Sequence, residues 1–568
     1  MKKGLLSVML AALVLAGSLV MTGCAAEGDA PAAGAIGGRV ELSPDNPVTI
    51  SIWIASNQMP PAPDNKISAL LEERLGVTLV YEITPLDLQD QRIGTLLAGG
   101  DLPDLIGSID LNALLLQGGA LRRLDDYLDT GNWPNLAAHV EPYLGRLSWT
   151  GGGVEDGFYI FPNWNRFYGD PPIMSPTHWH GAFYIQKSVL EWHGFPSLEN
   201  MTLERYFQLI EEYKIAHPMI DGMPTVGFGI PMFPGRVHSM TNPPNFLAGF
   251  PDDGPVMVDV ATGQARIFAN SVYAERYFRI LNEMFNRGLI DPETFTFTLD
   301  QWDAQLATGR VLGFHDARWA LGNPWDSLLA RGLYERTWVA TMPTFDGRAP
   351  RYASMPVLNI NMGMSISSSA ENPELLLTFL DTLMEEEWQI ILAWGIEGED
   401  YYVDENGVFY RSDAQRANAA DLTWRASNRL EALFDIMPKR EGTLSCGNAF
   451  VPANQPGEFF DSLSEYFQFF LESYNKQTWM EFLNPVTTNP PHFPAWQAHL
   501  PAGSAAQLAQ TQLDEVAAQF LPVAIMAPVA DFDARWQDYI DAIDRIDVEA
   551  FEAAFTEFVQ YRQALWGN

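Results

Sequence analysis

The chain has only two cysteines in 568 residues, Cys24 and Cys446. This number excludes the small disulfide-stapled architectures, in which several bridges replace a large hydrophobic core. We expect Cys446 to be a small buried residue, and the alternative is a reactive thiol.

Basic residues are scarce. Lys and Arg number 34 against 71 Asp and Glu, which gives a formal net charge of -37. A surface of this sign repels nucleic acid and anionic lipid headgroups. We therefore expect no nucleic-acid partner and no attachment to a membrane through a basic surface.

Long apolar runs are confined to the N-terminus, since no later stretch approaches the roughly eighteen residues that span a bilayer. Lys2 and Lys3 precede an apolar run from Leu5 to Val20, as in a bacterial export signal. Met21-Thr22-Gly23-Cys24 resembles a lipobox. Residues 1–23 are therefore expected to be a lipoprotein signal peptide, with Cys24 acylated. The alternative is an ordinary cleavage site without a lipid.

Residues 24–46 are small and polar, and they predict a flexible tether. With a lipid on Cys24, the folded part would lie outside the cytoplasm, anchored to the cell membrane. No internal disulfide could then form, because Cys446 would be the only thiol left.

Signatures of catalysis and metal binding are also missing. The sequence has no His-Glu-x-x-His, Gly-x-Ser-x-Gly, Cys-x-x-Cys or phosphate-binding loop. His178-Trp179-His180 is the best metal-like pattern, but two ligands without a third are too few for a zinc site. Asp252-Asp253-Gly254 and Asp404-Glu405-Asn406-Gly407 lack the spacing of a calcium loop. We therefore expect no metal, no cofactor and no enzyme activity. A glycosidase whose two carboxylates lie apart in the sequence is the alternative.

What the chain does contain is enough apolar material for at least two domains after residue 46, since 47% of its residues are hydrophobic. Residues 47–54 and 77–83 are strand-like, and the residues from Ile67 to Leu75 have helical spacing. Gly76 is placed to end that helix in a left-handed conformation. The order predicts a βαβ unit with parallel strands.

In open α/β sheets, ligands bind beyond the carboxyl ends of the strands. Trp53, Ser56, Asn57 and Gln58 at the end of the first strand are therefore candidate pocket residues. Burial in the core is the other interpretation for Trp53.

Aromatic residues give the clearest positive signal, because several lie in connections rich in Gly, Pro and Asn, where binding residues concentrate. A sugar ring has an apolar face and a hydroxylated edge, so it requires a flat aromatic platform and fixed polar groups. Burial in a core remains the other interpretation for each aromatic residue. The candidate platforms are Trp164, Tyr168, Trp179, Trp319, Trp325 and Trp394, and the candidate polar contacts are Asn57, Asp104, Asn163, Arg166, His180, Asp316 and Glu397.

Ordered motifs along residues 47–566 resemble the extracellular solute-binding proteins of ABC importers (family 1), in particular the LipO-like lipoprotein group. The motifs are Gly100-Asp101-Leu102-Pro103-Asp104-Leu105-Ile106, Leu124-Asp125-Asp126-Tyr127, Asp156 to Pro162, Phe183 to Gly194, Gly288-Leu289-Ile290-Asp291-Pro292, Gly309 to Phe314, Trp394 to Tyr401 and Trp536 to Ile540. Gln186-Lys187 and Arg545-Ile546-Asp547 depart from the residues usual in that family.

The resemblance implies an α/β, two-lobed periplasmic-binding-protein-like fold whose discontinuous lobes are joined by a hinge. It places 47–160 in lobe 1, 161–310 in lobe 2, 311–365 in a return to lobe 1, and 366–568 mainly in lobe 2 and the closing helices. It also implies a monomer that captures an oligosaccharide-like solute in a cleft between the lobes and delivers it to the importer's permease subunits.

Three alternatives stay open at this stage. The chain is a secreted glycan hydrolase, or the same fold binds a peptide, or it serves as a sensor subunit. Arg166 and Arg318 are possible clamps for the carboxylate of a peptide or a uronic acid.

Overall fold

Strand β1 (Val48–Ala55), helix α1 (Lys66–Leu75) and strand β2 (Val77–Thr84) form the predicted βαβ unit, with β1 and β2 parallel. The Asn65 side chain caps α1 by accepting hydrogen bonds from the backbone of Ile67 and Ser68. Gly76 ends the helix with φ 67°, in the left-handed region that favours glycine. The local sequence signals therefore produce the expected local structure.

The computed structural model describes residues 36–566 except 110–111, 150–153, 234–235, 355–357, 359–361, 484–488 and 502. The expected signal peptide 1–23, Cys24 and the tether up to residue 35 lie outside the described residues. Residues from Gly38 onward belong to one compact unit. Among the helices of the described ranges, none is long and apolar enough to cross a membrane.

The first sheet has the strand order β2-β1-β3-β14-β4, where β3 is Leu105–Ile109, β14 is Met362–Ile366 and β4 is Ile160–Pro162. Strand β3 is parallel to β1, and β14 is antiparallel to both β3 and β4. Strands β1, β2, β3 and β4 therefore all run in the same direction. Their carboxyl ends share one edge, which we call the first edge.

The second sheet has the order β13-β6-β12-β9, where β13 is Trp338–Thr341, β6 is Gly181–Gln186, β12 is Val311–Ala317 and β9 is Val226–Gly229. Strand β6 is antiparallel to β12 and β13, and β9 is parallel to β12. The carboxyl ends of β9, β12 and β13 therefore meet at the amino end of β6. We call this the second edge.

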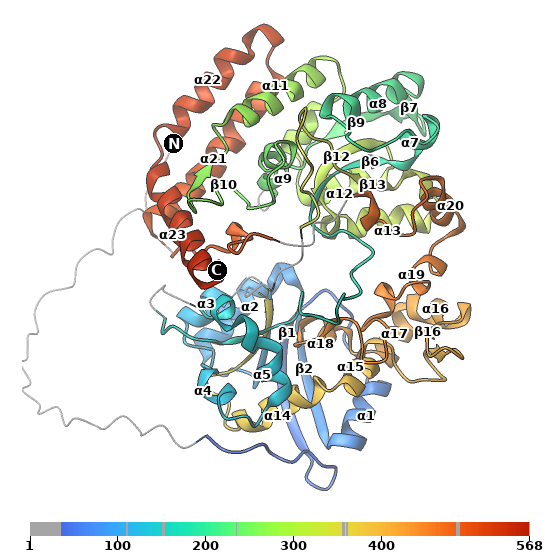
Figure 1. Cartoon of the computed structure of the whole chain (residues 1–568), viewed down its shortest axis with the longest axis vertical. Helices are drawn as coiled ribbons and strands as arrows, with labels where there is room; N and C mark the ends of the chain where they lie inside the picture. The colour runs from blue at the N-terminus through green and yellow to red at the C-terminus, as the bar shows by residue number, and fades with distance from the viewer. Residues whose placement is uncertain are drawn as a thin grey trace, which may run out of the picture. The chain divides into compact units, whose positions relative to one another are not determined.

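Helices cover both sheets (Figure 1). Those packed around the first sheet are α1, α2 (Gln89–Gly99), α3 (Asn112–Gln117), α4 (Asp125–Leu128), α5 (Pro134–Val140), α14 (Pro373–Leu383), α15 (Glu386–Ala393), α17 (Leu422–Asn428) and α18 (Glu431–Ile436). Those packed around the second sheet are α7 (Lys187–Trp192), α8 (Leu203–Ala216), α9 (Val237–Thr241), α10 (Pro243–Leu247), α11 (Val272–Asn286), α12 (Leu299–Ala307), α13 (Gly322–Ala330), α20 (Glu465–Ser473), α21 (Ala505–Met526), α22 (Phe532–Ile543) and α23 (Val548–Trp566).

Of the closing helices, α21 and α22 pack on α11, and Figure 1 draws these two (red) beside it (green). Helix α23 packs on α21. Asn282 of α11 is fully buried, and its amide donates to the carbonyls of Ala524, Ile525 and Ala527 at 3.1, 2.9 and 2.7 Å. These carbonyls lie at the end of α21, where the helix no longer supplies donors. Asn282 therefore stabilises the junction of α11 with the closing helices.

Strand pairing corrects the expected placement of two segments. Within 311–365, β12 and β13 belong to the second sheet, and the chain returns to the first sheet only at β14. Within 366–568, α14 packs on α5 and α18 packs on β1 and β14, so the chain stays with the first sheet through these helices. All seven positions of β12 are buried, so its sequence did not indicate which of the two sheets it would join.

Cys446 is exposed, which corrects the expectation that it is buried. It lies between the buried residues Leu444 and Ala449, in a turn closed by a hydrogen bond from Leu444 N to Asn448 O. The turn leaves the thiol outside the small core of Trp394, Tyr401 and Phe409.

Candidate functional site

The first edge brings together residues that follow two of its strands. Gln58, after β1, donates to the Asp435 carboxylate at 2.8 Å. Asn163, after β4, donates to the Asp435 backbone carbonyl at 2.5 Å. Asp435 of α18 therefore links the ends of β1 and β4. Trp164 is the next residue after Asn163 in the sequence.

Trp164 is half-buried, and the Lys439 ammonium lies 3.4 Å from its ring centroid. Lys439 is only 2% exposed, and it donates to the Phe434 carbonyl at 3.2 Å. Burial lowers the pKa of Lys439, and it raises the pKa of the neighbouring Glu441 carboxylate, which accepts a hydrogen bond from Asn165 N. The edge thus holds a cation beneath an aromatic ring.

Arg166 and Tyr168 lie beside this group. The Arg166 guanidinium is 4.5 Å from the Tyr168 ring centroid, and its Nε donates to the His139 carbonyl at 3.1 Å. Arg440 lies 4.9 Å from the same ring. Trp164, Arg166, Tyr168, Lys439 and Arg440 are named the first-edge cluster.

The second edge presents two tryptophans that are about half exposed, Trp179 at 49% and Trp319 at 55%. Ala317 at the end of β12 pairs with Gly181 at the start of β6, so the segments carrying the two rings meet. The Arg236 guanidinium lies 4.2 Å from the Trp319 centroid, and Arg318 lies 5.9 Å from the Trp179 centroid. The exposed rings are therefore each accompanied by an arginine.

Buried polar groups lie close to these rings. Asp316 is 1% exposed and accepts hydrogen bonds from Ser239 Oγ and Ala317 N, both at 2.8 Å. Arg236 Nη1 is 3.8 Å from the Asp316 carboxylate, whose pKa is raised by burial. Trp179, Arg236, Asp316, Arg318 and Trp319 are named the second-edge cluster.

The two histidines beside Trp179 precede β6 and do not lie on a strand. Their ring centroids are 5.9 Å apart, and burial lowers the pKa of His178 to about 3. Among the described residues, no group of three His, Cys, Asp or Glu side chains is placed to hold a metal. His180 itself is exposed next to Trp179.

Trp53, a predicted pocket residue, and Trp394, a predicted platform, are core residues. Trp53 is fully buried, and its Nε1 donates to Thr84 Oγ1 at 2.9 Å. Trp394 is also fully buried, and its Nε1 donates to the Ala449 carbonyl at 3.0 Å. Their ring nitrogens and faces are used internally, which corrects both assignments as ligand contacts. Trp325, 8% exposed, lies beneath Arg318 at 4.3 Å.

The side chains of Asp104 and Asn57, two predicted polar contacts, accept hydrogen bonds from other parts of the chain. Asp104 precedes β3 and so lies at the opposite edge of the sheet, where its carboxylate accepts from Ser51 N and Oγ at 2.9 and 2.7 Å. This position removes Asp104 from the predicted pocket. The Asn57 side chain is exposed at the first edge and accepts from Leu86 N at 3.1 Å.

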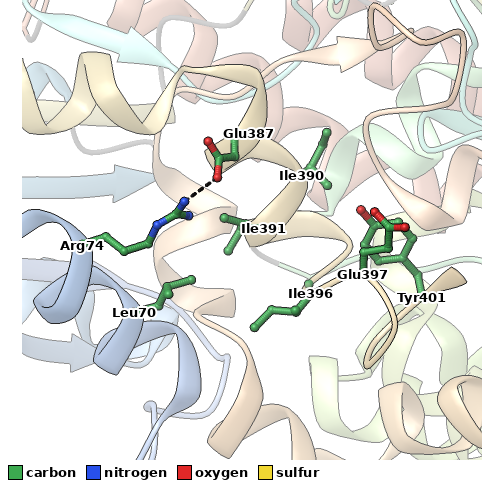
Figure 2. A pocket seen from close by; sticks show the side chains of 9 residues that line it. Leu70, Arg74, Glu387, Ile390, Ile391, Ile396, Glu397 and Tyr401 are labelled. Atoms are coloured by element: carbon green, nitrogen blue, oxygen red, sulfur yellow. Dashed lines mark hydrogen bonds and ion pairs between the residues drawn. The ribbon is translucent and has the colours of Figure 1, made fainter. Parts of the chain in front are cut away.

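Glu397 lines a groove between α1 and α15, with a volume of about 340 Å³ (Figure 2). Arg74 and Glu387 form an ion pair across it at 2.6 Å. Arg74 belongs to the last turn of α1, which ends where β2 begins, so the groove lies toward the edge opposite to the first edge. Glu397 is thus not brought together with the first-edge cluster.

Sequence reasoning missed the cations of both clusters other than Arg166 and Arg318. Lys439 and Arg440 lie far along the chain from Trp164, and Arg236 is far from Trp319. A signal was present in the composition, because an adjacent Lys-Arg pair stands out in a chain with twice as many acids as bases.

Comparisons with known proteins identify the fold. No family model matches the chain, and no curated protein matches it in sequence. Solved structures do match. An HMO binding, ABC-transporter associated solute binding protein from Bifidobacterium longum infantis superposes with a TM-score of 0.64 and 16% identity, covering 91% of this chain and 99% of that one.

Two further structures agree. An extracellular solute-binding protein from Bifidobacterium longum subsp. infantis has a TM-score of 0.62 and 17% identity, with 91% and 99% of the two chains covered. The S. pneumoniae substrate binding protein FusA, in complex with fructo-nystose, has a TM-score of 0.60 and 15% identity, with 91% and 100% covered. The chain therefore has the two-lobed α/β fold of these solute-binding proteins.

Proposed function

We propose that this chain is the solute-binding component of an ABC importer and that it binds an oligosaccharide between the first-edge and second-edge clusters. The observation that carries the proposal is the pair Trp179 and Trp319, two half-exposed rings placed beside buried polar groups at the end of β12. Large aromatic side chains of this exposure on strand-end loops are typical of binding sites.

The chemistry of the two clusters suits a sugar. The apolar face of a pyranose ring stacks on an indole, and its hydroxyl groups require fixed donors and acceptors around that platform. Trp164 is the equivalent platform at the first edge, with Asn163 beside it. The names of two matching structures record HMO and fructo-nystose as ligands, which supports an oligosaccharide over a single sugar.

The two-lobed fold supplies the means of capture. A ligand that contacts both lobes favours a closed form by the difference between its affinities for the closed and the open forms. Closure removes water from the clusters and strengthens their polar contacts. We propose that the closed form is recognised by the permease subunits, and that the ligand is released to them unaltered.

The remaining parts of the proposal concern location. With Cys24 acylated after removal of residues 1–23, a monomer would stay tethered outside the cell membrane through residues 24–46. The anchor is tested by growing cells with a radioactive fatty acid and comparing its incorporation into the unmodified protein and into a Cys24→Ser variant. Incorporation that persists in Cys24→Ser would contradict it.

Calorimetric titration of oligosaccharides tests the binding function. Trp179→Ala and Trp319→Ala are expected to weaken binding by about ten-fold or more each, because each removes a stacking platform. Trp192→Ala is the matched control, since Trp192 is 48% exposed on α7 and lies outside both clusters. Equal effects in all three variants, or cleavage of the sugar during incubation, would refute the proposal. Cleavage would establish a hydrolase instead, and binding of peptides alone would establish a peptide carrier.

A further inference from the structure

Arg318 of the second-edge cluster lies against two aromatic rings. Its guanidinium lies 4.3 Å from the ring centroid of Trp325 and 5.9 Å from that of Trp179. Among the described residues it forms no ion pair and no hydrogen bond, although the chain carries 71 acidic residues. Asp326 acts on it electrostatically from beyond ion-pair distance.

The surroundings of Arg318 are positive. Burial, followed by the charge of Arg318, lowers the pKa of Lys187, whose ammonium lies 4.6 Å from the Trp325 centroid. Lys187 donates only to neutral groups, Thr337 Oγ1 at 2.8 Å and the Trp338 carbonyl at 2.9 Å.

A second polar group beside Arg318 is also unsatisfied. The buried hydroxyl of Tyr184 has no hydrogen-bond partner in the described structure, and it is an electrostatic neighbour of both Arg318 and Asp316. Buried polar groups without partners are rare because desolvation without a hydrogen bond is costly. Arg318, which has no ion pair and lies near the half-exposed Trp179 ring, and the neighbouring Tyr184 hydroxyl together form an incomplete polar site.

We propose that Arg318 receives the carboxylate of an acidic sugar residue, such as a uronic acid, whose ring stacks on Trp179. The inference rests on the proposed function and narrows its ligand class. A guanidinium fork matches a carboxylate with two parallel hydrogen bonds. The Asp316 carboxylate does not compete for Arg318, because it is held by Ser239, by Ala317 N and by its proximity to Arg236.

The net negative charge of the chain opposes the approach of an anionic ligand. Salt screens this repulsion, so only acidic groups close to the ligand oppose its binding. The Debye length is about 8 Å at physiological ionic strength, so distant surface carboxylates contribute little. Groups in direct contact with the ligand decide its selectivity, and at this position the contact group is Arg318.

The test compares acidic oligosaccharides with their own carboxyl-reduced, neutral counterparts. Oligogalacturonides and oligomannuronates of three to five residues are titrated calorimetrically into the full-length protein at physiological salt. In the unmodified protein, the acidic member of at least one pair is expected to bind about ten-fold or more tightly than its reduced counterpart. In Arg318→Gln this ratio of dissociation constants is expected to fall to within about two-fold of unity, and Arg318→Lys, which keeps the charge without the fork, is expected to give an intermediate ratio.

Arg205→Gln is the control for the change in net charge, because Arg205 is exposed on α8 and its side chain makes no hydrogen bond or ion pair with the described residues. Thermal unfolding confirms that each variant is folded. If reduced sugars bind as tightly as the acidic ones, or if Arg318→Gln retains the ratio, the inference is overturned and the oligosaccharide function stands. If neither form of any sugar binds, both proposals fail.

Discussion

The Lys439 ammonium lies 3.4 Å from the centroid of the Trp164 ring, although the two residues belong to segments far apart in the sequence. The ring covers a cation that is only 2% exposed and that donates to one backbone carbonyl, that of Phe434. Trp164 thus covers a buried charge, in addition to its proposed role as a platform for a ligand.

Trp164→Ala is expected to weaken oligosaccharide binding by about ten-fold, because the stacking surface is lost and water gains access to Lys439. Calorimetric titration measures the affinity, and circular dichroism measures whether the fold persists. Unchanged affinity in a folded variant would remove Trp164 from the site.

Trp394→Ala is expected to act on stability. The residue is fully buried against Tyr401 and Phe409, at ring-centroid distances of 5.4 and 5.3 Å, so truncation leaves a cavity and an unpaired Ala449 carbonyl. The expected loss is about 3–5 kcal/mol of unfolding free energy. Urea unfolding followed by fluorescence measures it, and a loss smaller than that of Trp192→Ala would contradict the assignment of Trp394 to the core.

Asn282→Leu tests the junction between α11 and the end of α21. Leucine has a similar volume but cannot donate, so three buried carbonyls lose the amide that they share. The unfolding free energy is expected to fall by about 2–4 kcal/mol. Asn286→Leu is a milder companion variant, because Asn286 is half-buried and donates to only one of these carbonyls, that of Ala527, at 2.9 Å. A greater loss in Asn286→Leu would reverse the expected ranking.

Acidification is expected to destabilise the protein through His139. Burial lowers its pKa from 6.5 to about 3, so the folded state keeps this imidazole neutral while the unfolded state takes up a proton below pH 6.5. The stability linked to His139 is therefore complete above pH 6.5 and is lost as the pH falls toward 3. At pH 5 the loss is about 2 kcal/mol.

Unfolding free energies of the unmodified protein and of His139→Gln at pH 7.5 and pH 5 measure this linkage. The difference between the two proteins is expected to shrink at pH 5, because glutamine does not titrate. A constant difference across this range would show that His139 is not the group responsible.

The fold was predictable from the sequence where its signals are local. The unit from β1 to β2 followed from β-branched residues, helical spacing and Gly76, all of which act within one or two turns. The assignment of β12 and β13 failed because strand pairing with β6 is a long-range choice between two sheets, and a strand buried at every position has the same apolar pattern in either one.

The residues of the candidate site also divide into those whose positions depend on neighbours in the sequence and those whose positions depend on distant segments. Trp164, Arg166 and Tyr168 lie at the same sheet edge because they are close in sequence and follow one strand. Trp53 and Trp394 were misassigned because their burial depends on remote partners, Thr84 and Ala449. Lys439 and Arg236 were missed because only the folded chain brings them to the aromatic rings.

The short ladder between Phe167–Tyr168 and Glu441–Gly442 constrains where the protein can bend. Together with the hydrogen bond from Asn163 to Asp435, it fastens the chain leaving β4 to a segment from much later in the sequence. Ile173 N also donates to Thr443 Oγ1 at 3.0 Å, so this connection stays fastened to the later segment as far as Ile173. In the lobe movement that we propose, the bending of this connection would therefore fall between Ile173 and β6, a stretch that includes Trp179.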